Sequence, residues 1–383
     1  MAQSQAAAPA WSAMAQREIT GITADSREVA PGMIFAAIPG ARTDGSRFIA
    51  DAVARGAAAV LAPVDTAWPP GVPPRPLITD AMPRKRLAEI AAILAGGQPR
   101  RILAVTGTNG KTSTVDFLRQ ILTRAGHKAA SLGTLGLIAP GFESGPSLTT
   151  PDPVALARTM AVLKRAGVEN VALEASSHGL DQYRLDGLTL AGAAFSNLTR
   201  DHLDYHGDMA AYRAAKLRLF AELLPPGAPA LAMADLDGET LSALRRIAEA
   251  RDLAFGTVGP GGSAIRLLRA RPLPEGQKLT IEAGGGRRII DLPLPGRFQA
   301  DNALLAAALA RACGIADALD HLPYLSPVRG RLERVAVLPN GAAAYVDYAH
   351  TPDALERLLA ALRPHAHGRL VIVFGAGGDR DRG

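Results

Sequence analysis

Cysteine and aromatic side chains are scarce in this sequence. The single cysteine, Cys313, excludes an internal disulfide and any metal site built from several thiolates. Aromatic residues make up only 4% of the chain, and few of them lie among the scattered arginines, although the formal net charge is +6. A surface that stacks bases or follows a phosphate backbone would gather both kinds of side chain. We therefore expect no nucleic-acid partner.

Long apolar runs and an export signal are also missing. No segment reaches about 18 uninterrupted apolar residues, the length that a membrane-spanning helix needs. The start of the chain, MAQSQAAAPAWSAMAQ, lacks a basic stretch followed by an apolar core. The sequence therefore predicts a soluble cytoplasmic protein without membrane insertion.

Lysine is rare as well, with six residues among the 42 lysines and arginines. An ammonium group can lose its proton, whereas a guanidinium group stays charged. A lysine kept in an arginine-rich chain therefore indicates a position that needs a compact, deprotonatable amine. Lys111 and Lys216 are the two lysines that lie in chemically distinctive motifs.

Strand-like and helix-like segments alternate along the 383 residues. After a boundary near residue 98, the patterns predict a strand at 101–106, a helix at 111–125, a strand at 129–134 and a long loop to Thr150. Asp152 and Pro153 begin a helix that ends near Gly167. Strands at 168–175 and 192–198 and a helix near 209–223 follow. This order predicts an α/β fold with a doubly wound parallel sheet.

The remaining segments predict two additions to this sheet. Short β-rich pieces at 264–293 indicate a small antiparallel addition, followed by a helix at 299–314. The alternation then restarts with a strand at 343–347, a helix at 352–363 and a strand at 369–375. About 55 residues are few for a well-buried domain. We therefore expect three domains, 1–97, 98–328 and an incomplete one at 329–383.

The stretch AVTGTNGKTST, residues 104–114, joins a predicted strand to a predicted helix. Backbone N–H groups at such a helix start bind phosphate, a lysine adds a point charge, and a threonine hydroxyl can bind Mg²⁺. Only Thr108 and Asn109 separate Gly107 from Gly110, whereas the usual phosphate loop has four residues there. The stretch is either a short phosphate loop that binds ATP or an ordinary turn before a helix.

Two further motifs follow predicted strands. Glu174 ends a strand that should lie beside the strand of the loop, where ligands bind in such sheets, so it either holds Mg²⁺ or is a surface carboxylate. His202 is either a metal ligand or a structural histidine. Lys216 lies on the following helix, and an ammonium group beside Mg²⁺ would be repelled. Lys216 therefore either lies elsewhere or carries an altered charge.

Six motifs together resemble the Mur ligases, the ATP-dependent amide-forming enzymes of peptidoglycan precursor synthesis. They are TGTNGKT, EASSHGL, NLTRDHLDYHGDM followed by Y and AK, GRFQADNALLAAA, RGRLE and VDYAHTPDAL, and the resemblance spans residues 22 to 383. DSREVAPG, GARTDG, SLTTPD and SSHGLDQYR are most similar to the branch that adds the third peptide residue to UDP-N-acetylmuramoyl-L-alanyl-D-glutamate. The resemblance implies an N-terminal UDP-sugar-binding domain, a central ATP-binding domain and a C-terminal Rossmann-like amino-acid-binding domain.

The resemblance implies that ATP phosphorylates the substrate carboxylate and that an amine then attacks the acyl phosphate. Lys111, His202 and Lys216 match the catalytic positions. Thr112 and Glu174 match the ligands of one Mg²⁺, and His202 matches a ligand of a second. Lys216 matches an N-carboxylated lysine, whose carbamate replaces a cation by an anion.

The resemblance also implies binding residues. The ATP positions are Gly107, Thr108, Asn109, Gly110, Lys111, Thr112, Ser113, Asn302, Arg331, Asp347 and His350. The positions for the UDP-sugar substrate are Ser26, Asp44, Gly45, Thr149, Thr150, Ser176, Gln182 and Arg184, and Arg380 matches a contact to the carboxylate of the added amino acid.

The added amino acid is expected to be meso-diaminopimelate, with L-lysine as the alternative. Another Mur or folylpolyglutamate-type ligase, and a non-enzymatic nucleotide-binding switch, are the other candidates. The Asp-Asn-Pro-Arg stretch with which the family selects the amino acid is absent from this sequence. We therefore expect an incomplete, monomeric copy that binds the UDP-sugar dipeptide and does not make tripeptide.

Overall fold

The computed structural model describes residues 18–40, 43–143, 145, 148–350 and 352–375. These residues form two compact units. The first unit contains residues 18–100, 151–167 and 178–189, and the second contains residues 101–150, 168–177 and 190–375. The predicted contact residue Arg380 lies outside the described residues.

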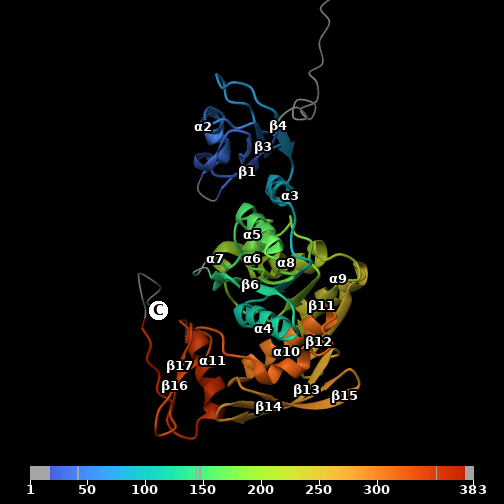
Figure 1. The fold of residues 1–383 in the computed structure, drawn as a ribbon, viewed down its shortest axis with the longest axis vertical. Helices are drawn as coiled ribbons and strands as arrows, with labels where there is room; N and C mark the ends of the chain where they lie inside the picture. The colour runs from blue at the N-terminus through green and yellow to red at the C-terminus, as the bar shows by residue number, and fades with distance from the viewer. Residues whose placement is uncertain (1–17, 41–42, 144, 146–147, 351, 376–383) are drawn as a thin grey trace, which may run out of the picture. The chain divides into compact units, whose positions relative to one another are not determined.

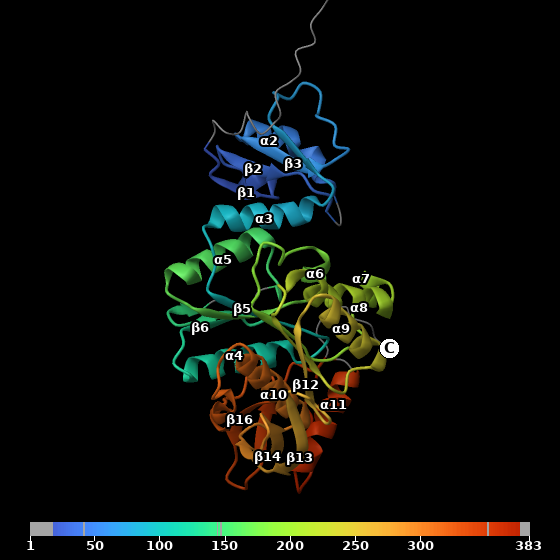
Figure 2. The ribbon, with the colours of Figure 1, turned by 90° about the vertical axis from the view of Figure 1, so that its right-hand side faces the viewer.

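The first unit is built on a four-stranded parallel sheet in the order β1 (Gly21–Thr23), β2 (Met33–Ala36), β3 (Ala59–Pro63) and β4 (Leu77–Asp80). Helix α2 (Ile49–Ala54) and the short turns η1 (Ser26–Glu28) and η2 (Gly45–Phe48) join the strands. Helices α3 (Pro83–Ala95) and α5 (Pro153–Arg165) pack against each other (Figure 2). All four residues of β2 are buried, because apolar side chains cover both faces of the sheet.

The second unit contains the predicted doubly wound sheet. Six parallel strands follow the order β12 (Ala254–Gly259), β11 (Pro229–Met233), β10 (Gly192–Phe195), β5 (Arg101–Thr106), β9 (Asn170–Glu174) and β6 (Ala129–Gly133). Strand β5 lies between β9 and β10 and pairs with both in parallel. The strand order therefore reverses at β5, and ligands bind at the carboxyl ends of strands at such a point.

Groups of antiparallel strands extend both edges of this sheet, and the group beside β12 is joined to it by a short parallel pairing at Val258 and Gly259. The predicted antiparallel addition is confirmed as β13 (Ile265–Leu273), β14 (Gly276–Ala283) and β15 (Gly286–Leu292). The predicted long loop after residue 134 is partly wrong, because β7 (Gly136–Ala139) turns back along β6 and β8 (Phe142–Glu143) pairs with β7. These strands are too short for a clear pattern, and they cover backbone groups that an open edge would expose.

Helices pack against the sheet of the second unit. Figures 1 and 2 show α4 (Lys111–Arg124) and α10 (Arg297–Ala312) side by side against it. The predicted helix at 209–223 is present as α8 (Met209–Arg218), whose last turn widens into the π-helix η3 (Leu219–Leu223). The unit also contains α7 (Leu203–His206), α9 (Gly238–Ala250) and η4 (Ala318–Tyr324), while α6 (Ser177–Asp181) begins where the two units meet in sequence.

The C-terminal segment of the second unit differs from its prediction. Strands β16 (Glu333–Val337) and β17 (Ala343–Val346) form an antiparallel pair, followed by α11 (Pro352–Leu362) and η5 (Arg363–His365). The predicted strand at 369–375 is wrong, because these residues pair with no strand among the residues that the structure describes. Val371, Val373 and Phe374 are 81%, 94% and 71% exposed. An apolar pattern alone does not form a strand when its backbone groups lack a neighbouring strand.

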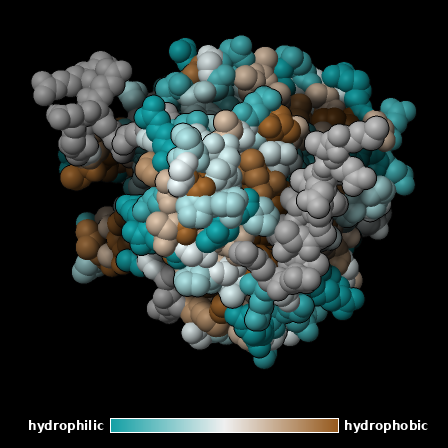
Figure 3. Space-filling view, turned by 90° about the horizontal axis from the view of Figure 1, so that it is seen from above, coloured by the Kyte–Doolittle hydropathy of each residue, from teal (hydrophilic) through white to brown (hydrophobic). Residues whose placement is uncertain are grey.

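Apolar side chains are scattered over the molecular surface. The face in Figure 3 is a mosaic of small hydrophilic and hydrophobic areas. Isolated exposed apolar side chains are normal on a folded protein. Among the helices in the described parts of the chain, none has the length and apolar character needed to cross a membrane.

Candidate functional site

The loop between β5 and α4 requires glycine at two positions. Gly107 and Gly110 have φ angles of 144° and 82°, in the region that side chains disfavour. A Cβ atom on Gly107 would lie 2.0 Å from the Ser196 hydroxyl, and one on Gly110 would lie 2.3 Å from Asn302 Oδ1. The spacing of the two glycines is therefore imposed by the structure around the loop.

The segment after β10 holds this loop. The backbone N–H of Thr108 donates to the Asn197 carbonyl at 2.8 Å, and that of Asn109 donates to Asn197 Oδ1 at 2.9 Å. The Thr108 hydroxyl donates to the Thr199 carbonyl at 3.1 Å, and the Ser196 hydroxyl donates to the Asn109 carbonyl at 2.6 Å. The sequence analysis missed Ser196, Asn197 and Thr199, although all three lie in or beside the NLTRD motif.

Lys111 and Lys216 meet at one carbonyl group. Lys111 Nζ donates to the carbonyls of Gly107 and Thr108 at 2.9 and 2.8 Å, and Lys216 Nζ donates to Gly107 at 2.7 Å. Burial holds the pKa of Lys216 well below its usual value, and the charge of Lys111 lowers it further. Burial also lowers the pKa of Lys111, which the charge of Glu174 opposes. The structure thus brings together the two lysines that the sequence singled out.

Tyr212 connects Lys216 to the loop and was missed by the sequence analysis. Lys216 Nζ lies 4.4 Å from the centroid of the Tyr212 ring, and the Tyr212 hydroxyl is 3.2 Å from the Thr108 hydroxyl. Burial raises the pKa of Tyr212 to about 12, so this hydroxyl is neutral at pH 7. Tyr212 precedes Lys216 by four residues on α8, which places both side chains on one face of the helix. That spacing was the available signal.

Glu174 lies at the end of β9, next to the strand of the loop, as predicted. It is 1% exposed, and residue Val105 of β5 is its partner in the sheet. The N–H and hydroxyl of Thr134 donate to its two carboxylate oxygens at 2.8 and 3.2 Å. Burial raises the pKa of Glu174, while Lys111 and the hydrogen bonds lower it. A Cβ atom on Gly133 would lie 2.1 Å from Glu174 Oε1, so the carboxylate fits because residue 133 has no side chain.

A small cavity of about 130 Å³ is lined by residues of the loop together with Glu174 and Thr134. Its lining contains most of the predicted loop residues together with predicted metal and substrate residues. They are Thr108, Asn109, Gly110, Lys111, Thr112, Ser113, Thr134, Thr149, Glu174 and Arg331. The cavity contains two cationic side chains, which suit phosphate groups. It also contains hydroxyl and carboxylate oxygens, which suit Mg²⁺.

Arg331 reaches this cavity from the segment that follows η4. Its guanidinium carbon lies 4.8 Å from the centroid of the Tyr348 ring, and its carbonyl accepts a hydrogen bond from Gln299 Nε2 at 2.9 Å. Asn302 Nδ2 donates to Gln299 Oε1 at 3.3 Å, while Asn302 Oδ1 lies against Gly110. The buried amides of Gln299 and Asn302 therefore link Arg331 to the loop. Gln299 was missed by the sequence analysis.

Asp347 and His350 lie in the segment after β17. The Asp347 carboxylate accepts hydrogen bonds from the N–H groups of Leu332 and Ala349 at 2.7 and 2.8 Å. His350 Nδ1 lies 2.9 Å from the Tyr348 carbonyl. Both side chains therefore hold backbone near Arg331, and neither is among the residues that line the cavity. Their nucleotide contacts stay predictions.

His202 has an unusual backbone conformation for a residue with a side chain. Its φ angle is 52°, its Nε2 atom lies 3.4 Å from an Asp201 carboxylate oxygen, and its ring centroid is 6.3 Å from that of Tyr212. About half of its side chain is exposed. Within the described ranges, no three His, Cys, Asp or Glu side chains form a cluster that could hold a metal ion. The metal role of His202 stays a prediction.

Three predicted substrate residues lie beside Glu174 in the second unit. The Thr150 hydroxyl donates to the Glu174 carbonyl at 2.9 Å and accepts from the N–H and hydroxyl of Ser176, both at 3.0 Å. The Thr149 hydroxyl is 3.1 Å from that of Thr134. These short polar side chains therefore form one network with the buried carboxylate.

The other predicted substrate residues within the described ranges lie in the first unit. Ser26 is buried in η1, and Asp44 accepts a hydrogen bond from the Ser46 N–H at the start of η2. A Cβ atom on Gly45 would lie 2.6 Å from the Ile38 carbonyl. Arg184 donates to Gln182 Oε1 at 2.8 Å. Their substrate contacts stay predictions.

Three family descriptions match this chain, and together they cover most of it. "Mur ligase family, catalytic domain" matches residues 18–100, "Mur ligase middle domain" matches residues 105–310, and "Mur ligase, glutamate ligase domain" matches residues 330–383.

Two curated relatives are similar over nearly the whole chain. Both are named UDP-N-acetylmuramoyl-L-alanyl-D-glutamate--2,6-diaminopimelate ligase. The protein from Caulobacter vibrioides is 50% identical over 373 residues, which are 95% of this chain and 76% of the relative. The protein from Bradyrhizobium diazoefficiens is 52% identical over 379 residues, which are 97% of this chain and 76% of the relative.

Solved structures share the fold. A structure of a ligase with the same name has a TM-score of 0.79 at 30% identity and covers 95% of this chain and 74% of its own. Mycobacterium tuberculosis folylpolyglutamate synthase has a TM-score of 0.60 at 20% identity, covers 74% of this chain and 71% of its own, and shows similarity of fold alone. With the matches to the family descriptions and the curated relatives, these findings show that the chain belongs to the Mur ligase family.

Proposed function

We propose that this protein is a MurE-type ligase that uses ATP to join meso-diaminopimelate to UDP-N-acetylmuramoyl-L-alanyl-D-glutamate in peptidoglycan synthesis. The observation that carries the proposal is the convergence of Lys111, Lys216 and Glu174 around the loop at the strand-order reversal. The names of the curated relatives favour diaminopimelate over the L-lysine alternative.

The loop and its two cations suit the phosphate groups of ATP. The start of α4 presents backbone N–H groups, and Lys111 and Arg331 both line the cavity. The substrate carboxylate and the γ-phosphate are both anionic, so they approach each other only where fixed positive charge reduces their repulsion. We assign Lys111 and Arg331 to that task, and the buried amides of Gln299 and Asn302 hold Arg331 in place.

The residues around Glu174 fit Mg²⁺ by their chemistry. The Glu174 carboxylate and the Thr112 hydroxyl are hard oxygen donors that line one cavity, and Thr134 orients the carboxylate. When bound, Mg²⁺ neutralises phosphate charge. His202 and a carbamate on Lys216 are our candidates to hold a second ion.

The reaction has two steps. An oxygen of the substrate carboxylate forms a bond to the γ-phosphorus, and the bond to the β-phosphate oxygen breaks, which gives an acyl phosphate and ADP. The amine of the added amino acid then attacks the acyl carbon, and phosphate leaves as the nitrogen loses a proton. The protein contributes mainly position and charge, because the acyl phosphate is itself a reactive group.

The wider assignment follows the sequence motifs. We assign UDP-sugar recognition to Ser26, Asp44 and Gly45, and muramoyl-peptide recognition to Thr149, Thr150, Ser176, Gln182 and Arg184. We propose the domains 1–97, 98–328 and 329–383. The cytoplasmic location and the monomeric state stay predictions from the sequence.

The function can be tested by measuring ADP and phosphate release. In an enzyme as long as the curated relatives, we expect release to increase at least about tenfold when UDP-N-acetylmuramoyl-L-alanyl-D-glutamate and meso-diaminopimelate are both present, because the acyl phosphate forms only on the bound substrate. L-lysine should replace diaminopimelate poorly. A nucleotide switch would instead hydrolyse ATP at the same rate with and without the UDP-sugar.

Gly133→Ala should lower ligase turnover by about 10²-fold. The new methyl group would overlap Glu174 Oε1, which lies 2.1 Å from its position, so the carboxylate must leave its place beside Thr134. Gly238→Ala is the matched control, because no atom lies within 4 Å of its added Cβ. Equal turnover in the two variants would contradict the role of Glu174.

A further inference from the structure

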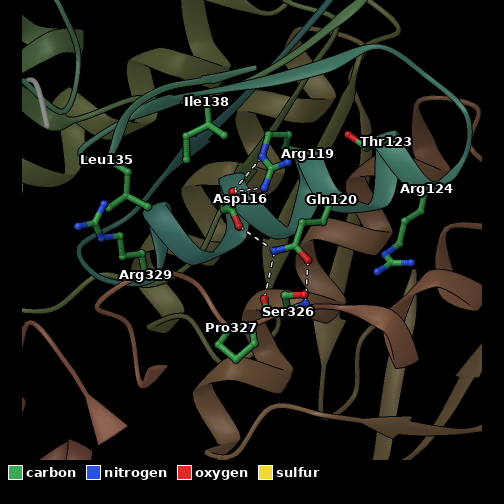
Figure 4. A pocket seen from close by; sticks show the side chains of 10 residues that line it. All are labelled: Asp116, Arg119, Gln120, Thr123, Arg124, Leu135, Ile138, Ser326, Pro327 and Arg329. Atoms are coloured by element: carbon green, nitrogen blue, oxygen red, sulfur yellow. Dashed lines mark hydrogen bonds and ion pairs between the residues drawn. The ribbon is translucent and has the colours of Figure 1, made fainter. Parts of the chain in front are cut away.

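Gln120 joins the helix of the phosphate loop to a distant part of the chain. Its Nε2 atom donates to the Ser326 carbonyl at 3.1 Å, and the Ser326 N–H donates to Gln120 Oε1 at 2.8 Å (Figure 4). One side chain thus replaces both hydrogen bonds that a neighbouring strand would supply. We name this pair of hydrogen bonds between Gln120 and Ser326 the amide clamp.

The Gln120 amide is held in one orientation by its own helix. Its Nε2 atom also donates to Asp116 Oδ2 at 2.8 Å, and Arg119 donates to Asp116 Oδ1 at 3.0 and 2.7 Å. Asp116 is only 6% exposed, and an ionised carboxylate can accept hydrogen bonds but cannot donate them. Asp116 therefore fixes the Gln120 amide with its NH₂ group towards the carboxylate. The spacings i+3 and i+4 place these side chains on one face of α4, as Figure 4 shows.

The amide clamp acts on the segment that leads to Arg331. In the described part of the chain, Gln120 is the only residue whose side chain hydrogen-bonds the backbone of residues 325–329. Leu325 and Val328 are buried, and the Arg331 N–H donates to the Val328 carbonyl at 2.9 Å. The turn from Ser326 to Arg331 is therefore compact, and a displacement at its start changes where Arg331 enters the cavity.

Lys111 and Gln120 lie on the same helix, the first at its start and the second nine residues later. A helix of this length moves as one body, so the loop lysine and the clamp keep a fixed separation. We propose that Gln120 is a positioning residue that sets the place of Arg331 relative to Lys111 and so tunes ATP binding. The inference rests on the proposed function only in taking ATP as the ligand of that cavity.

Gln120→Leu tests the clamp, because leucine keeps similar bulk and removes both hydrogen bonds. We expect the Kd for ATP with Mg²⁺, measured by titration calorimetry on the full chain, to rise about tenfold. Gln120→Glu keeps the acceptor for the Ser326 N–H, but it places a carboxylate oxygen against Asp116 and the Ser326 carbonyl, so its Kd should rise at least as far as that of Gln120→Leu. Gln98→Leu is the matched control, since Gln98 makes the same two hydrogen bonds to Thr189, at 2.7 and 3.0 Å, within the first unit. The Kd of Gln98→Leu for ATP should stay unchanged, while its Tm should fall by about as much as the Tm of Gln120→Leu.

A double-mutant cycle separates positioning from a general loss of stability. If Gln120 acts through Arg331, the Arg331→Ala and Gln120→Leu/Arg331→Ala variants should have the same Kd for ATP. The proposed role of the amide clamp would be overturned if Gln120→Leu raised the Kd for ATP by the same factor with and without Arg331. It would also be overturned if Gln120→Leu left the Kd unchanged. If the clamp prediction failed in this way, weaker ATP binding by Lys111→Ala would still support the proposed ATP site. An absence of ATP binding by the unmodified chain would overturn the proposed function, and the clamp with it.

Discussion

In an enzyme as long as the curated relatives, Lys111→Ala should lower ligase turnover by about 10³-fold, the loss expected when one charge-stabilising group leaves an active site. Lys111 Nζ contacts the carbonyls of Gly107 and Thr108 from within the loop and lines the cavity beside Glu174. No other lysine lines that cavity, within the residues that the structure describes, and Arg331 enters it from another segment. Arg331 therefore keeps one positive charge in the described cavity, but we expect it not to replace the charge that Lys111 places within the loop.

The measurement is the rate of tripeptide formation at saturating ATP, together with the Kd for ATP. Lys278→Ala is the control, because Lys278 is half exposed on β14 and pairs with Asp291 at 3.1 Å. Its turnover should stay within about twofold of the unmodified enzyme, as surface ion pairs contribute little. Near-normal ligation by Lys111→Ala would show that the loop does not bind the transferred phosphate.

The central sheet could be predicted from the sequence because its signals are local. Apolar runs such as RILAVT and NVALE end at glycine-rich or polar turns, and parallel strands buried on both faces show this pattern. The same order of segments placed Glu174 beside the loop, and the pairing of β5 with β9 confirms it. The rarity of lysine identified Lys111 and Lys216 before any contact was known.

The missed features depend on partners far away in the sequence. Thr134 meets Glu174 across 40 residues, and Gln120 meets Ser326 across 206. No sequence pattern around a threonine or a glutamine predicts such a long-range contact. The strand predicted at 369–375 failed for the related reason that an apolar pattern cannot show whether a neighbouring strand is present. Tyr212 is different, because its helical spacing to Lys216 was visible in the sequence.

The arrangement of the two lysines creates an electrostatic problem. Two ammonium groups that share the Gly107 carbonyl repel each other, and Lys216 is fully buried while Lys111 is partly buried. The charge of Glu174 offsets part of this for Lys111. For Lys216, burial and the charge of Lys111 both favour the neutral amine, and Asp201 opposes them. The site therefore favours a Lys216 without its positive charge.

Lys216→Arg should abolish ligation, with a loss of about 10³-fold, although the formal charge is conserved. A neutral amine attacks CO₂ to form a carbamate and releases one proton, and the lowered pKa of Lys216 supplies that amine. A guanidinium group stays protonated and forms no carbamate. Lys216 is 1% exposed, so the larger arginine would also place a permanent cation in a buried site beside Lys111.

The carbamate can be separated from a purely structural role by chemical rescue. Lys216→Ala removes the side chain, and an added small carboxylic acid such as acetate should restore part of the activity by supplying the missing anion, with no such effect on Lys216→Arg, which leaves no space. Lys278→Arg is the control for the exchange itself, and its turnover should match that of the unmodified enzyme. Mass spectrometry under CO₂ should show the added carboxylate on Lys216, the one lysine with a pKa held well below its usual value. Full activity of Lys216→Arg, or a Lys216→Ala variant that acetate leaves unchanged, would show that the ligase works without this anion.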